Sequence, residues 1–86
     1  MTMSAAGAPA FAFGIGDDVV ARLEAGAPFN IDAGAPVRRN RRPSWAVATI
    51  TGREVRGGAP WYVLAFRLHE DRCVCMEAES SIEGYA

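Results

Sequence analysis

Three runs of strand-forming residues follow one another in the second half of the chain, with only short polar breaks between them. The runs cover residues 45–51, 61–68 and 72–77. They are dominated by apolar, β-branched and aromatic side chains, which favour strands. The breaks, at residues 52–59 and 69–71, are too short to hold a crossover helix and therefore predict turns between consecutive antiparallel strands. This pattern predicts an all-β domain.

A further strand is expected at residues 19–23, directly after a turn signal at residues 14–18. Two adjacent valines open this run, which is short for a helix, so we prefer a strand to the alternative of a helix over residues 17–25. The prolines and glycines of residues 24–44 predict a long loop. Residues 78–82 predict one short helical turn near the C-terminus, with the isoleucine at its end closing the core.

The chain has 86 residues, which is the size of one small domain. Leu, Ile, Val and Phe make up about a fifth of them, so the hydrophobic core is expected to be thin. Residues 1–13 are rich in Ala, Gly, Pro and Ser and are expected to form a flexible N-terminal tail, pinned at its end by Phe11 and Phe13. Residues 14–86 are expected to form the folded domain.

The strongest strand signal, at residues 61–68, is apolar on both faces. One face carries Tyr62, Leu64, Phe66 and Leu68, which are assigned to the core. The other face carries Trp61, Val63, Ala65 and Arg67. An antiparallel strand with one solvated face should alternate more clearly between apolar and polar residues. We therefore expect the outer face to be covered by the tail, by the long loop or by a second subunit, and a homo-oligomer is the favoured state of a chain with so thin a core.

The two cysteines are expected to be reduced thiols. Cys73 and Cys75 are two residues apart on a predicted strand, a spacing that disfavours a relaxed disulfide, so a cytoplasmic location is expected. No apolar run approaches the roughly 18 residues that a membrane span needs, and no membrane partner is expected. His69 precedes the cysteines without the spacing typical of zinc sites. No metal, cofactor or catalytic residue is assigned, and the sequence favours a protein that is not an enzyme.

Charge is unevenly distributed along a chain whose formal net charge is −1. Residues 38–67 hold seven arginines and a single acid, whereas both ends of the chain are acidic. The densest cluster contains Arg38, Arg39, Arg41 and Arg42. Beside Trp45 it resembles a nucleic-acid contact, in which guanidinium groups meet phosphates and an indole stacks on a base. An overall pI near 5.7 argues against a dedicated nucleic-acid-binding protein and favours a solvated loop instead.

The order of strand, long loop, three hairpin-linked strands and short helical turn resembles the small SH3-like barrels, including the Tudor-like barrels. That resemblance implies a small five-stranded barrel. Residues 13–19, Phe-Gly-Ile-Gly-Asp-Asp-Val, also resemble the opening of the plasmid- and integron-borne type II dihydrofolate reductases of bacteria, which assemble as tetramers around a central pore. Their pore is lined by Val-Gln-Ile-Tyr, where residues 74–77 of this chain read Val-Cys-Met-Glu. Because the Gln and Tyr are replaced, the resemblance extends to fold and assembly but not to reductase activity.

These observations predict a non-enzymatic binding or interaction module that associates with itself. Its candidate ligand-binding residues are Trp45, Trp61, Arg38, Arg39, Arg41 and Arg42. The alternative is a barrel that binds nucleic acid, or another anionic ligand, through the arginine cluster. A more remote alternative is a reductase-like oligomer with a central ligand site.

Overall fold

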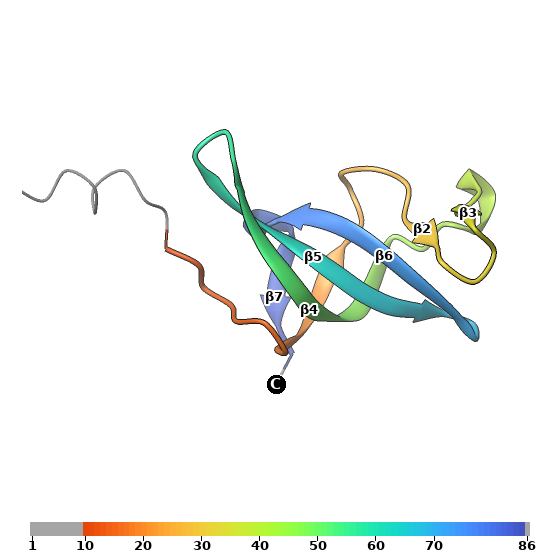
Figure 1. The fold of residues 1–86 in the computed structure, drawn as a ribbon, viewed down its shortest axis with the longest axis horizontal. Coiled ribbons are helices and arrows are strands. Elements are labelled where there is room, and N and C mark those ends of the chain that lie inside the picture. The colour runs from red at the N-terminus through yellow and green to blue at the C-terminus, as the bar shows by residue number, and fades with distance from the viewer. Residues whose placement is uncertain (1–9, 86) are drawn as a thin grey trace, which may run out of the picture.

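A computed structural model of the chain describes residues 10–85, which form one antiparallel sheet and two short 3-10 turns (Figure 1). The strands are β1 (Asp18–Arg22), β2 (Phe29–Asn30), β3 (Ala35–Pro36), β4 (Trp45–Arg56), β5 (Ala59–Leu68), β6 (Asp71–Ala78) and β7 (Ile82–Gly84). The 3-10 turns are η1 (Arg39–Arg41) and η2 (Glu79–Ser81). The all-β prediction is therefore confirmed, and η2 supplies the short helical turn expected near the C-terminus.

The sheet has the strand order β3-β2-β6-β5-β4-β1-β7, and no hydrogen bonds join β3 to β7 in the described part of the chain. The expected small barrel of five strands is therefore confirmed only as an antiparallel sheet, because the sheet of residues 10–85 is open and has seven strands. The three strands for which the sequence predicted no residue range, β2, β3 and β7, are only two or three residues long. Such short strands leave no alternation of side chains that could be recognised in a sequence.

The β4–β5 hairpin is longer than predicted, because its turn needs only two residues. Gly57 and Gly58 have φ angles of 57° and 78°, the positive values that two-residue hairpin turns require. Most of the expected turn at residues 52–59 therefore belongs to β4 and β5. The pairing shifts by one residue between Ile50 and Gly52, which forms a β-bulge in β4.

The predicted inner face of β5 forms the centre of the core. Tyr62 and Leu64 are fully buried and Phe66 is nearly so. The neighbouring strands contribute Val19, Ala21, Ala46, Ala48 and Ile50. Ile82 follows η2 and is also buried, as expected. The strand predicted at residues 19–23 is confirmed as β1, in preference to the helix.

The segment at residues 24–44 is not the structureless loop that its prolines and glycines predicted. It forms the small β2–β3 hairpin and then η1, and Val37 between them is buried in the core. Phe29 pairs with Val74, so β2 continues the sheet beyond β6 instead of covering its face. The backbone polar groups at the edge of β6 explain this pairing, because an unpaired edge offers hydrogen bonds to a passing segment.

The end of the N-terminal tail is held against the core, as predicted. The rings of Phe11 and Phe13 contact the ring of Tyr62 edge-on, with centroids 5.8 and 5.7 Å away. The rest of the tail prediction concerns residues 1–9, which lie outside the described residues. Within residues 10–85, no helix is long and apolar enough to cross a membrane.

Candidate functional site

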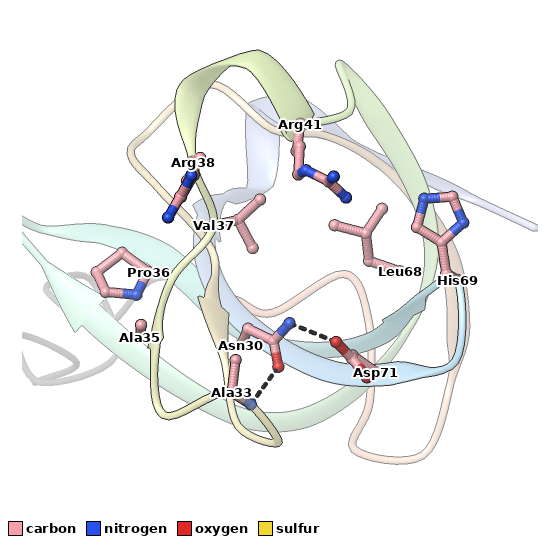
Figure 2. A pocket seen from close by; sticks show the side chains of 10 residues that line it. All are labelled: Asn30, Ala33, Ala35, Pro36, Val37, Arg38, Arg41, Leu68, His69 and Asp71. Carbon is pink, nitrogen blue, oxygen red and sulfur yellow. Dashed lines mark hydrogen bonds between the residues drawn. The ribbon is translucent and has the colours of Figure 1, made fainter.

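A hollow of about 370 Å³ lies beside the arginine cluster, at one end of the sheet (Figure 2). It is lined by Asn30, Ala33, Ala35, Pro36, Val37, Arg38, Arg41, Leu68, His69 and Asp71. We call it the end cavity. The β2–β3 hairpin, η1 and the turn between β5 and β6 meet around it, so residues distant in the sequence share one small space.

The local geometry of η1 divides the arginine cluster into two pairs. Residues three apart in a 3-10 turn lie on the same side of it, and Arg38 and Arg41 have this spacing. Both line the end cavity, whereas Arg39 and Arg42 do not. The sequence predicted the cluster but not this division, which depends on the 3-10 turn.

The four arginines of the cluster have no acidic partner within ion-pair distance in the described residues, unlike several other arginines. Arg72 forms a salt bridge with Asp32 at 2.7 Å, and Arg56 pairs with Glu54. Arg22 lies near Glu24 and Glu83. The positive charge around the end cavity is therefore not neutralised by any ion pair between described residues, and it creates a local field that attracts anions.

The interior of the end cavity is apolar and its lower rim is polar. Val37 and Leu68 point towards its centre from opposite sides, and His69 stands at the rim (Figure 2). The amide of Asn30 donates a 2.9 Å hydrogen bond to the carboxylate of Asp71. The cavity thus combines two guanidinium groups with an apolar floor and one acidic group on the rim.

A second hollow, of about 400 Å³, lies on the outer face of the sheet. Val47, Ala65 and Val74 line it, together with Ile31 from the segment after β2. Val47 and Ile31 are 45% and 42% exposed. The outer face is therefore apolar, as predicted, and it has no cover in the described part of the chain.

Trp45 and Trp61, both expected at a ligand surface, are not brought together. Trp45 begins β4 and is 59% exposed, whereas Trp61 pairs with Glu54 near the other end of that strand. The nine residue steps from Trp45 to Glu54 correspond to roughly 30 Å of extended chain. Trp61 is half-buried beneath the guanidinium of Arg56, 5.4 Å from its ring centroid. The two indoles do not form an aromatic cage.

A buried carboxylate was not anticipated from the sequence. Glu77 is 1% exposed, and its oxygens accept hydrogen bonds from the N–H groups of Glu24 and Ala25 at 3.0–3.2 Å. Burial raises the pKa of Glu77, and these two hydrogen bonds oppose that change only in part. Glu77 therefore fixes the start of the long connection between β1 and β4.

The cysteines are free, and their thiols are held in the protonated form. Burial raises the pKa of Cys75 to about 12 and also raises that of Cys73. A protonated thiol is a poor nucleophile and a poor metal ligand. Within residues 10–85, no group of three or more His, Cys, Asp or Glu side chains is placed to hold a metal ion.

Comparisons of the chain with models of protein families, with curated proteins and with solved structures find no match. The geometry of the described residues is therefore the basis for the proposals that follow.

Proposed function

We propose that this protein is a non-enzymatic interaction module that associates with a second copy of itself through the outer face of its sheet. The observation that carries this proposal is the uncovered apolar hollow lined by Val47, Ala65 and Val74. Exposed apolar patches with polar rims are typical of interaction surfaces. Association also compensates for the thin core of a small domain.

Segments of the same chain are engaged elsewhere. Phe11 and Phe13 pack on Tyr62, whose side chain belongs to the opposite, inner face. β2 continues the sheet beside β6 and leaves the hollow open. The described part of the tail thus lies on the inner side, and the long connection borders the hollow through Ile31 without closing it.

Charge favours a second copy as the occupant. Arg67 lines the hollow on the β5–β6 side and has no ion-pair partner in residues 10–85, whereas Arg72 beside it is already paired with Asp32. Asp18 lies on β1, next to Thr49 at the other side of the hollow. A two-fold axis parallel to the strands would bring the basic side of each copy over the acidic side of the other. Symmetric dimers use such self-complementary surfaces.

The test is the mass in solution, by size-exclusion chromatography with light scattering, of the native chain and of Val47→Glu. The native chain is expected to be a dimer or a larger closed assembly, and Val47→Glu a monomer. Val55→Glu is the matched control, because Val55 lies on the same strand and is similarly exposed, at 49%, but does not line the hollow.

A native monomer at both low and high salt would overturn the proposal. If deletion of residues 1–9 then creates a dimer, the tail is the cover instead. Retention of the assembly by Val47→Glu, with loss of it by Val55→Glu, would also assign the interface to another surface.

A second candidate function is the binding of nucleic acid through the arginine cluster. The four guanidinium groups without an ion-pair partner among the described residues support it. Binding of a single-stranded oligonucleotide should then weaken steeply as salt rises, and replacing Arg38, Arg39, Arg41 and Arg42 by Gln should abolish it. Absence of binding at low salt would exclude this candidate.

The relation to SH3-like barrels and the cytoplasmic location also remain proposals. The order of β1, a long connection, the β4–β5–β6 meander and a 3-10 turn supports the former. Two cysteines that form no disulfide with each other support a reducing compartment.

A further inference from the structure

We infer that the end cavity is a binding site for an organic phosphate of about the size of a mononucleotide. The site differs from the outer face that carries the proposed self-association, so the two proposals stand independently. Three features of the cavity support the inference, namely its cationic rim, its apolar floor and its size.

The cationic rim matches a phosphate monoester. Arg38 and Arg41 line the cavity from the two ends of η1, Arg41 on the Leu68 side and Arg38 on the Pro36 side (Figure 2), and neither has an ion-pair partner in residues 10–85. Guanidinium groups bind phosphate oxygens through paired, charge-assisted hydrogen bonds. Two of them supply the two positive charges that a phosphate monoester dianion requires.

The floor of the cavity indicates an apolar or aromatic moiety attached to the phosphate. Val37 and Leu68 meet at the centre of the cavity (Figure 2). The volume of about 370 Å³ falls near the lower end of the range of roughly 300–1,000 Å³ typical of small-molecule sites. Inorganic phosphate alone would leave this floor unused.

The opposite rim favours a compact ligand over a continuous polyanion. Asp71 would repel a second phosphate group placed near it, whereas its carboxylate accepts hydrogen bonds from hydroxyl or amino groups. Arg39 and Arg42 do not line the cavity and so cannot extend a single phosphate track into it. The ligand is therefore expected to place its phosphate at η1 and its donor groups beside Asp71.

The experiment is a calorimetric or NMR titration of the full chain with adenosine monophosphate, phenyl phosphate and inorganic phosphate at low salt. The two organic phosphates should bind more tightly than inorganic phosphate. Arg38→Gln combined with Arg41→Gln should weaken their binding about tenfold or more. Arg39→Gln combined with Arg42→Gln removes the same charge and should weaken it less than about threefold.

The control pair needs a check of folding, because the Nε of Arg42 is buried without a hydrogen-bond partner in the described residues. Arg39→Gln alone replaces it if the pair is unstable. Ala33→Trp provides a probe that leaves charge unchanged, since Ala33 is exposed and lines the cavity, and it should block the organic phosphates by filling that space.

Equal losses in the two arginine pairs would overturn the inference, because they would reflect the general field of the cluster. Equal affinity for inorganic and organic phosphate would overturn the role of the apolar floor. Failure of all three probes to bind would overturn the site itself. Repeating the titration on Val47→Glu separates each result from self-association, because Val47 lies on the outer face.

Discussion

The hydroxyl of Tyr62 donates a 2.6 Å hydrogen bond to Oε1 of Glu79, and the same oxygen accepts the N–H of Ala12 at 3.0 Å. The N–H of Phe13 in turn donates to the Tyr62 hydroxyl at 3.2 Å. One buried phenol thus joins β5, η2 and the N-terminal segment. The N–H groups of Ala12 and Phe13 are held by Glu79 and Tyr62, and the rings of Phe11 and Phe13 pack on the phenol itself.

Tyr62→Phe should loosen the N-terminal segment while leaving the core filled. The ring is retained, but the Phe13 N–H loses its acceptor and the Glu79 carboxylate loses one of its two donors, which should lower the free energy of unfolding by about 1–2 kcal/mol. Urea denaturation measures this change, and amide exchange at Ala12 and Phe13 should become faster. Tyr85→Phe is the control, since Tyr85 is 60% exposed, and it should change neither quantity. Unchanged exchange in Tyr62→Phe would show that ring packing and the hydrogen bond from Ala12 to Glu79 hold the segment without the hydroxyl.

The contributions of Glu77 and Glu79 to the free energy of unfolding should depend on pH in opposite directions. The hydrogen bond from Tyr62 lowers the pKa of Glu79, so its stabilisation is present above pH 4.5 and is lost as pH falls through the folded pKa. Burial raises the pKa of Glu77, so its contribution is fully present below pH 4.5 and is lost as pH rises through the folded pKa.

Glu77→Gln isolates the second effect. Near pH 4 the native side chain is protonated and resembles the amide, so the two proteins should differ least there. As pH rises through the raised pKa of Glu77, the native protein should lose stability relative to the variant. Urea denaturation from pH 4 to 8 measures the difference, with the exposed Glu83→Gln as control. A difference that moves in the opposite direction would mean that the N–H groups of Glu24 and Ala25 outweigh the cost of burial.

Prediction from the sequence was most accurate where the alternation of side chains along one strand determines which residues are buried. The alternation in residues 61–68 identified Tyr62, Leu64 and Phe66 as core residues, because a strand places every second side chain on one face. Prediction from the sequence failed where contacts between residues distant along the chain determine the structure. A carboxylate such as Glu77 ordinarily indicates a surface position, and the N–H groups that hold it lie more than fifty residues upstream. The division of the arginine cluster likewise depends on the 3-10 turn of η1, for which the sequence contains no clear signal.

The two-residue turn of the β4–β5 hairpin should tolerate asparagine but not a β-branched residue. Gly57 has a φ of 57°, a value that Asn adopts readily and Val does not. Among residues 10–85, no heavy atom beyond the chain neighbours of Gly57 lies within 4 Å of a Cβ placed at this position, so backbone strain should decide the outcome. Gly57→Asn should leave the free energy of unfolding nearly unchanged, and Gly57→Val should lower it by about 1–2 kcal/mol. Equal thermal stability of the two variants would contradict the positive φ angle of Gly57 in this turn.

Trp45→Ala should weaken self-association while leaving the stability of the folded monomer nearly unchanged. Trp45 is 59% exposed, so its removal should change the free energy of unfolding of the monomer by no more than about 0.5 kcal/mol. On β4, Trp45 lies two residues from Val47 and on the same outward side, so it extends the apolar surface proposed to bind a second copy. Dilution monitored by light scattering should therefore show a higher dissociation constant, whereas Trp61→Ala, which removes the half-buried ring beneath Arg56, should chiefly lower stability. If Trp45→Ala unfolds the protein instead, the indole is part of the core and the interface does not include it.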